Sequence, residues 1–267
     1  MIKNFEFKTK YSVDDLVEII RLLRTPDGCP WDREQTHQSI KKNFIEETYE
    51  VVEAINKDSA EMLREELGDV LMQILLHTQM EAEKNSFDFY DVVDELAKKL
   101  IIRHPHVFGD EVCKSADDVL KTWDRVKTQT KNQKTITQAM DAIPRELPAL
   151  MRAQKVQSKA AKVGFDWENI SGAVEKIHSE CDEFEQALEN NDSENAVEEL
   201  GDLLFSCVNA SRFIKADAEE ALTAASDKFI RRFKVVEELS IKRGIDMKAA
   251  SLEQLDALWD EAKEILK

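Results

Sequence analysis

The sequence has 267 residues, with 54 Asp or Glu against 37 Lys or Arg, which gives a formal net charge of −17. A chain of this length can bury a hydrophobic core as one large domain or as two small ones. The acidity argues against a protein that binds nucleic acid by neutralising phosphates, although a nucleotide held through a divalent metal remains compatible with it. With only 7 Gly and 5 Pro, long helices are favoured over a turn-rich β-sandwich.

The four cysteines are far apart and form no CxxC pair, which is typical of free thiols in a reducing compartment. The first residues contain no apolar stretch with a cleavage site, and no run reaches 18 apolar residues. The expectation is a cytoplasmic protein that binds neither membrane nor nucleic acid.

Apolar residues recur with helical spacing along the chain, and alternating strand patterns are missing. In the first half, helices are expected at 13–24, 38–57, 60–84, 89–102 and 116–130. In the second half, they are expected at 146–162, 171–190, 193–214, 217–242 and 252–266. The sequence therefore predicts an all-α protein in which helix pairs pack as antiparallel bundles.

An acidic pattern occurs twice at a constant offset of 133 residues. Each copy has two acidic pairs with i, i+3 spacing, one pair on each of two successive predicted helices. The pairs are Glu47, Glu50, Glu66 and Asp69 in the first copy and Glu180, Glu183, Glu199 and Asp202 in the second. We therefore expect two copies of one unit, residues 1–130 and 145–267, joined by a polar linker at 131–144.

Basic and aromatic residues repeat nearly in register with the acidic ones. The matching i, i+4 pairs are Lys99 and Arg103 with Lys228 and Arg232, and Trp123 and Lys127 with Trp259 and Lys263. Each basic pair lies on one helix face, where it either holds phosphates beyond the reach of a metal or is ordinary surface charge. The tryptophans either stack on a base or belong to the core.

Helix geometry places the acids, because each residue turns the side chain by about 100°. Relative to Phe44 in the apolar stripe, Glu47 and Glu50 fall at about 300° and 240°. The acidic pair of the next helix falls at the same angles relative to Leu63. Two facing antiparallel helices carry such flanks to the same side, so the four carboxylates of each copy should converge.

Converging carboxylates repel one another unless a positive charge lies among them. Oxygen-only ligands suit a hard cation, Mg²⁺ or Mn²⁺. The alternative is a solvated acidic face, which is common in a chain this acidic. Gly68 and Gly201 each precede the last acid of a set, within a predicted helix where glycine is unfavourable. They indicate either close helix approach or access for a ligand.

The stretch Glu46-Glu47-xx-Glu50 with Glu66-xx-Asp69 resembles the EExxE and ExxD signature of the MazG family of all-α nucleoside triphosphate pyrophosphohydrolases. Further matching stretches lie at 28–32, 103–108, 147–155 and 163–167. The resemblance spans nearly the whole chain from about residue 12. It implies two tandem MazG-like helical domains, Mg²⁺-dependent hydrolysis of nucleoside triphosphates to monophosphate and pyrophosphate, and a homodimer.

The resemblance also implies roles for individual residues. The two acidic sets would hold the metal, and the triphosphate would contact Lys228, Arg232, Trp259 and Lys263, with Lys99 and Arg103 as counterparts. Glu180 in the second copy, and Glu46 or Glu47 in the first, would accept a proton from water. One departure matters, because the first glutamate of the motif is Glu46 in the first copy and Ser179 in the second. The sequence therefore leaves open which copy is active.

Two other classes remain as alternatives. A di-metal carboxylate bundle needs Glu-xx-His on facing helices, which Glu34 with His37 and Glu175 with His178 match by spacing. On its helix, however, the second of these pairs falls on the flank opposite Glu180. The other alternative is a non-catalytic helical interaction module whose acids serve solubility.

Overall fold

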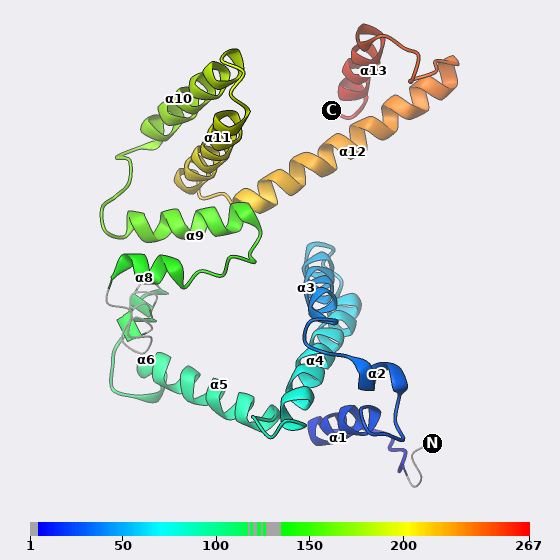
Figure 1. Cartoon of the computed structure of the whole chain (residues 1–267), viewed down its shortest axis with the longest axis vertical. Helices are drawn as coiled ribbons and strands as arrows, with labels where there is room; N and C mark the ends of the chain where they lie inside the picture. Colours follow the sequence, from blue (N-terminus) through cyan, green and yellow to red (C-terminus); the bar gives the residue numbers. More distant parts are fainter. Residues whose placement is uncertain (1–4, 117, 120–121, 124, 127–134) are drawn as a thin grey trace. The chain divides into compact units, whose positions relative to one another are not determined.

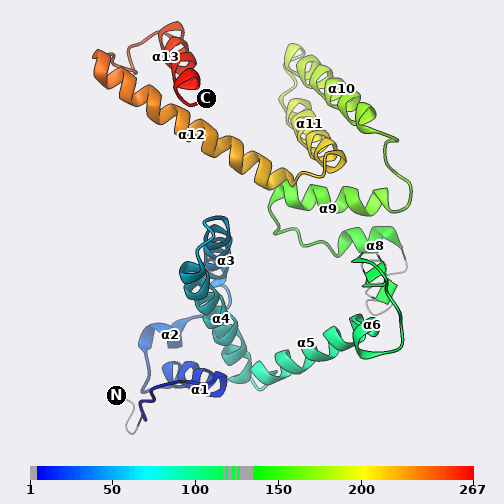
Figure 2. The same ribbon diagram turned by 180° about the vertical axis from the view of Figure 1, so that it is seen from behind.

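The computed structural model describes residues 5–116, 118–119, 122–123, 125–126 and 135–267 (Figure 1). Every regular element within these ranges is a helix, which confirms the predicted all-α class. The chain divides into two units, Met1–Thr130 and Lys131–Lys267. Figure 2 shows the same helices from behind. Each unit is described by itself below.

Unit one follows the predicted order of helices. Its described helices are α1 (Val13–Leu23), α2 (Pro30–Glu34), α3 (Lys41–Asn56), α4 (Ala60–Ala82), α5 (Phe89–Arg103) and α6 (Pro105–Phe108). The short helices α2 and α6 both start at a proline, and the sequence did not predict them. Much of the helix expected at 116–130 lies outside the described residues.

Helices α3 and α4 form the hairpin that carries the first acidic set. Asp58 at φ 50° turns the chain between them, and the Ser59 side chain accepts a hydrogen bond from the Met62 N–H at the start of α4. A connection this short brings two helices together as antiparallel neighbours. Helix α1 packs on α4 around a buried apolar cluster of Ile20, Ile40, Leu75, Leu76 and Met80.

Unit two repeats the helix hairpin in its second and third long helices. Its helices are α8 (Ile136–Asp141), α9 (Ala149–Ala161), α10 (Ile170–Glu189), α11 (Ser193–Phe213), α12 (Ala218–Arg243) and α13 (Leu252–Ile265). Helix α8 falls in the stretch 131–144, where the sequence indicated only a polar segment. Asn191 at φ 55° makes the turn of the α10–α11 hairpin. Helix α9 packs on α11, while α12 packs against α9 and α13.

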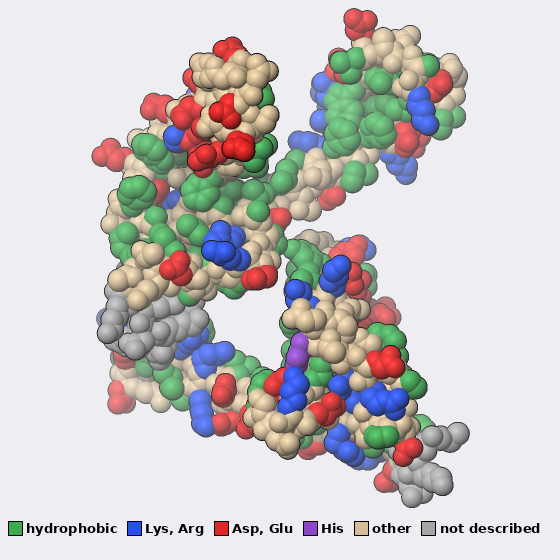
Figure 3. All heavy atoms as spheres, viewed as in Figure 1, with side chains coloured by type: hydrophobic (Ala, Val, Ile, Leu, Met, Phe, Trp, Pro, Cys, Tyr) green, Lys and Arg blue, Asp and Glu red, His purple; other side chains and the backbone are tan. Residues whose placement is uncertain are grey.

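The predicted apolar stripes are only partly covered in the described chain. Leu188 and Leu200 of the α10–α11 hairpin are 54% and 43% exposed, and Leu67 of α4 is 52% exposed. Figure 3 shows apolar side chains at the surface of unit two over α9 and over the α12–α13 pair. The apolar stripes of the two hairpin helices are therefore too wide to be buried fully by each other and by one further helix.

Candidate metal and nucleotide site

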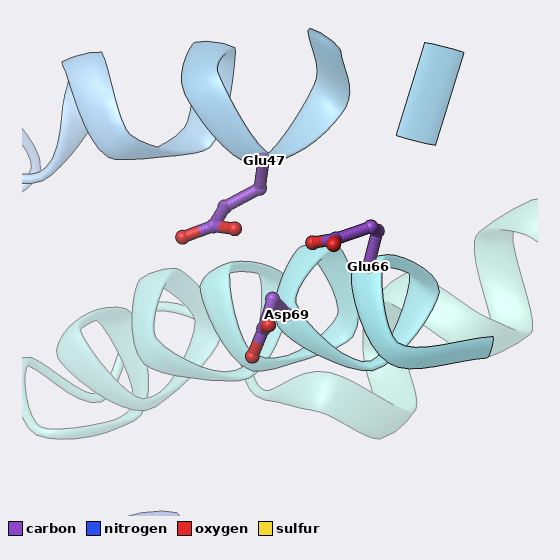
Figure 4. A group of neighbouring side chains, drawn as sticks. All are labelled: Glu47, Glu66 and Asp69. Atoms are coloured by element: carbon purple, nitrogen blue, oxygen red, sulfur yellow. The ribbon is translucent and has the colours of Figure 1, made fainter. Parts of the chain in front are cut away.

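Both hairpins bring three carboxylates together. In unit one, Glu47 of α3 meets Glu66 and Asp69 of α4, with one oxygen from each lying within 4.8 Å of the other two. Figure 4 shows Glu47 reaching from its helix toward the other two side chains.

Unit two repeats the group at the same register. Glu180 of α10 meets Glu199 and Asp202 of α11 within the same 4.8 Å. The convergence expected from helix geometry is therefore present for three acids in each copy.

The fourth acid of each set borders the closest group of oxygens without belonging to it. Glu50 and Glu183 are exposed, and neither belongs to the group of oxygens within 4.8 Å. Glu46, the first glutamate of the motif, is also exposed and outside the group. The angle around the helix does not separate the fourth acids from the group, because Asp69 and Asp202 also fall at about 240° and belong to it.

Mutual repulsion is visible in the acidity of the clustered groups. Burial, then Asp69 and Glu50, raise the pKa of Glu47 above its usual value. Burial raises the pKa of Glu199 as well, followed by the charges of Glu183 and Glu180. Both clusters therefore hold their negative charge at a free-energy cost that a bound cation would relieve.

A lysine distinguishes the second cluster from the first. Lys176 of α10 forms an ion pair with the buried carboxylate of Glu180, and its Nζ lies 3.7 Å from an oxygen of Glu183. Asn43 stands at the corresponding position of the first copy. The sequence reasoning missed Lys176, although its i, i+4 spacing from Glu180 was a usable signal.

The serine that replaces the first motif glutamate also contacts the acidic set. The Ser179 hydroxyl donates a 2.8 Å hydrogen bond to Oε1 of Glu183. A hydroxyl in this place orients the outer carboxylate, whereas a glutamate would repel it.

The helix-interior glycines do not mark close helix packing. A Cβ built on Gly68 or Gly201 meets no atom within 4 Å. Of the two readings from the sequence, close helix approach is wrong for both residues. The space in front of each glycine is open among the described residues, which leaves access for a ligand as the other interpretation.

A cavity of about 680 Å³ adjoins the acidic cluster of unit two. Glu180, Asp202 and Lys176 form part of its wall. The rest comes from α8, α9, α11 and the loop before α10, including Gln157, Phe165, Trp167, Phe205, Asn209 and Arg212. The volume lies in the range of small-molecule sites, about 300–1,000 Å³.

The predicted phosphate-binding residues form a second group. In unit two, the Arg232 guanidinium lies 5.9 Å from the ring centre of Trp259. In unit one, Arg103 lies 5.5 Å from the ring centre of Trp123. The two copies thus repeat an arginine over a tryptophan, a favourable cation–π contact.

The remaining basic residues point elsewhere. Lys263 pairs with Asp260 at 2.6 Å, while Lys228 and Lys99 are exposed. Within the described ranges, no hydrogen bond or ion pair joins Lys228, Arg232 or Lys263 to the acidic cluster. Lys127, the counterpart of Lys263, lies outside the described residues.

The histidine pattern of a di-metal bundle is not assembled at either cluster. His37 stacks on His77, with 2.8 Å between their Nδ1 atoms, and its Nε2 lies 2.7 Å from Glu81 Oε1. Both acidic groups found in the described chain consist of carboxylates alone. The donor set thus lacks the histidines that such a bundle requires.

Known proteins match the chain over nearly its whole length. The MazG nucleotide pyrophosphohydrolase domain matches residues 35–108 and 169–236, which cover both acidic hairpins. A nucleoside triphosphate pyrophosphohydrolase/pyrophosphatase MazG of Thermotoga maritima is 45% identical over 94% of this chain and 95% of its own length.

Two further relatives also match the chain across both units. A nucleoside triphosphate pyrophosphohydrolase of Escherichia coli K12 is 44% identical over 94% of this chain and 97% of its own length. The uncharacterized protein YabN of Bacillus subtilis is 47% identical over 92% of this chain, but over only 50% of its own length. With its paired carboxylate hairpins and a family domain matched in each unit, the chain belongs to the MazG family of nucleotide pyrophosphohydrolases.

Proposed function

We propose that the protein hydrolyses nucleoside triphosphates, ribo or deoxy, to the monophosphate and pyrophosphate, with Mg²⁺ as cofactor and Mn²⁺ as a substitute. The observation that carries the proposal is a carboxylate-only cluster, two of whose three members line a cavity of about 680 Å³. The family match and the names of the relatives from T. maritima and E. coli support it.

The donor set fits a hard divalent cation. Three carboxylates from two helices offer oxygens within 4.8 Å, and Mg²⁺ accepts a few carboxylates while keeping positions for water and phosphate. When bound, the cation would supply a Lewis acid that neutralises charge on the phosphate oxygens. We assign this role to Glu180, Glu199, Asp202 and the outer Glu183, and in unit one to Glu47, Glu66, Asp69 and Glu50.

The reaction transfers the nucleotidyl group, through its α-phosphorus, to water. A water oxygen forms a bond to the α-phosphorus while the bond to the α–β bridging oxygen breaks, which releases pyrophosphate. Glu180 accepts the proton of the water in unit two, and Glu47 or Glu46 takes this part in unit one. Lys176, already at the cluster, is placed to pair with phosphate oxygens once the metal occupies the carboxylates.

The basic and aromatic group completes the binding of the triphosphate. We assign Lys228, Arg232, Trp259 and Lys263 to its phosphates, with Lys99 and Arg103 as the counterparts in unit one. Lys176 and the adjoining cavity favour unit two as the working copy. In this proposal residues 1–130 and 145–267 are the two domains, and 131–144 links them.

A second copy of the chain is the proposed partner. Val197, Leu200 and Leu204 of α11 are 72%, 43% and 50% exposed, which leaves an apolar strip along the hairpin of unit two. A homodimer that buries this strip would form the bundle that one hairpin lacks. Light scattering coupled to size-exclusion chromatography should give the mass of two chains, and Leu204→Glu should shift it toward one.

The helices and the cysteines bear on the cellular compartment of the protein and on its partners. No helix in the described part of the chain is long and apolar enough to cross a membrane. All four cysteines are free, as in a reducing compartment. We propose a cytoplasmic enzyme that uses neither membrane nor nucleic acid as a partner.

Product analysis tests the activity. Purified protein is incubated with ATP and with each other NTP and dNTP, with Mg²⁺ and with chelator, and the products are separated by ion-exchange chromatography. The proposal requires monophosphate and pyrophosphate in equal amounts, and only with metal. Formation of ADP and phosphate, or no hydrolysis of any member of the panel, contradicts it.

A further inference from the structure

Two histidines lie in direct contact at the end of the α3–α4 hairpin opposite its turn. His37 belongs to the segment between α2 and α3, and His77 lies on α4. Their Nδ1 atoms are 2.8 Å apart, and the planes of the two rings differ by only 2°. Both residues are half-buried, and the metal chemistry proposed above uses neither of them.

A nitrogen–nitrogen distance of 2.8 Å leaves room for one hydrogen between the two rings. One Nδ1 must carry the hydrogen and donate it, while the other must offer its lone pair. If both histidines were charged, two N–H groups would face each other across this distance and repel. The contact therefore persists only while at least one of the two rings is neutral.

A carboxylate fixes the other side of His37. Its Nε2 lies 2.7 Å from Oε1 of Glu81, and Nζ of Lys84 lies 2.7 Å from the same oxygen. Lys84, then His37, lower the pKa of Glu81 to about 2, so this carboxylate is ionised at neutral pH and can only accept. His37 Nε2 therefore carries a hydrogen, and a first proton taken up by the pair has its counter-charge at Glu81.

The surroundings of His77 oppose a second proton. Burial, then the His37 ring, lower the pKa of His77 below its usual value. Its neighbour on α3 is the apolar ring of Phe44, with 5.8 Å between the ring centres. Among the described residues, the charged groups in contact with the pair are Glu81 and Lys84, and both lie beside His37. A charge on His77 thus gains no carboxylate of its own.

Two further anchors hold the segment 35–40 against its neighbours. Arg24, at the end of α1, donates a hydrogen bond to the Gln35 carbonyl and pairs with Glu83 beyond α4. Ile40 is 1% exposed and packs in the apolar core of unit one. Arginine and isoleucine do not change charge near neutral pH, and Arg24 lowers the pKa of Glu83. Of these three anchors, the histidine contact is the one that a proton can break.

The second copy lacks the pair. At the constant offset of 133, the positions of His37, His77 and Glu81 hold Ile170, Ala210 and Ile214. None of these side chains can take up or release a proton. The histidine contact is therefore a feature of unit one alone.

From these contacts we infer that His37 and His77 form a proton-operated latch, closed at neutral pH and opened when a second proton enters the pair. Opening frees the segment 35–39 from α4 and loosens the start of α3, which follows it, while Ile40 stays buried. The inference is independent of the proposed activity. Because the pKa of His77 is lowered, the stability from the closed latch is present above the usual value of 6.5 and is lost as pH falls through the lower folded pKa.

The clustered acids of the same hairpin respond to acid in the opposite direction. Burial, then the neighbouring acids, raise the pKa of Glu47 and of Glu66, so their protonation favours the folded hairpin. A loss of protection at the start of α3 on acidification therefore has the sign expected of the latch and not of the metal-free cluster.

Hydrogen exchange followed by mass spectrometry tests the latch in the full chain without metal. Protection factors, corrected for the intrinsic pH dependence of exchange, are measured for peptides covering 35–44 at about pH 7.5 and about pH 5. His77→Asn places an amide near the Nδ1 position that can donate or accept but takes up no proton, whereas His77→Ala removes the contact. His178→Asn, in an exposed histidine of unit two, is the matched control.

In wild type and in His178→Asn, protection should fall by about fivefold or more at the lower pH, which corresponds to about 1 kcal/mol, the size of one hydrogen bond. His77→Asn should keep its protection at both pH values, and His77→Ala should be poorly protected at both. Wild-type protection that does not change with pH overturns the inference. So does an equal fall in His77→Asn, or wild-type protection of His77→Ala at neutral pH.

Discussion

Each clustered carboxylate is a proposed metal ligand, and without the metal its negative charge lowers the stability of the folded protein. Burial and the neighbouring acids raise the pKa of Glu199, so the folded protein holds its proton more tightly than the unfolded chain does. Its contribution to stability is therefore present below the usual value of 4.5 and is lost as pH rises through the higher folded pKa. At neutral pH the metal-free cluster should be a weak point of unit two.

The variant Glu199→Gln tests this penalty. In metal-free protein, the melting temperature of Glu199→Gln minus that of wild type should increase as pH rises from below 4.5 to neutral. Differential scanning calorimetry at several pH values measures the difference. Glu238→Gln, in an exposed residue of α12, should leave it near zero. A difference that falls with pH would mean that Glu199 is stabilised as the carboxylate.

Substituting the equivalent acid in each copy shows which of the two copies is catalytically active. Asp202→Asn removes a charged ligand next to the cavity and should lower kcat/KM by about 100-fold, because metal stabilisation of the transition state amounts to several kcal/mol. Asp69→Asn makes the same change at the same register of unit one and should leave most of the activity. Steady-state pyrophosphate release measures both. The reverse order of effects would place the working site in unit one.

The effect of a glycine on helix stability depends on whether it lies at the end of the helix or inside it. Gly244 ends α12 at φ 65°, where its N–H bonds to the carbonyl of Ile241, and the next N–H returns to that of Ser240. This is the helix-terminating pattern that favours glycine, because a Cβ in the left-handed region clashes with the backbone. Gly201, inside α11, has ordinary helical surroundings and open space around it.

Two alanine substitutions in unit two should therefore act in opposite directions. Gly244→Ala should lower the free energy of unfolding by about 1 kcal/mol through left-handed strain. Gly201→Ala should raise it by up to about 1 kcal/mol, since alanine favours the helix and meets no neighbour. Urea unfolding followed by circular dichroism measures both. Destabilisation by Gly201→Ala would show that α11 approaches another part of the assembly at this point.

At the scale of the whole molecule, ligand binding couples to folding through the clusters. A cation that binds the native carboxylates and not the unfolded chain adds about 2.7 kcal/mol at 100 times its Kd. The carboxylates lie on two helices of a hairpin, so the hairpin must be closed for the cation to bind them together.

Melting of the chelator-stripped protein with added Mg²⁺ measures this coupling. At about 2–4 °C per kcal/mol, the transition of the unit that binds should rise by about 5–10 °C. The rise should shrink when Glu180 or Asp202 is neutralised, and as pH falls far enough for protons to compete with the metal. A melting temperature indifferent to millimolar Mg²⁺ would mean that the acids are a solvated face.

The sequence by itself determined the helices and the carboxylate placement. Local spacing fixes the rotation of a side chain around its helix, so the shared flank of Glu180 with Glu199 followed from about 100° per residue. The same local rules predicted nine of the described helices to within a few residues, and much of the tenth, expected at 116–130, lies outside the described residues. The short helices α2, α6 and α8 were missed because so few residues carry no periodic signal.

Only the tertiary structure decided which acids meet and what lies beside them. Glu183 shares the flank of Glu180 but falls outside the closest group, although Asp202, at the same angle on its own helix, belongs to it. The cavity depends on Gln157, Phe165 and Asn209, which come from three segments separated along the chain. No local pattern encodes such a space, because its shape is set by how side chains from separate elements pack.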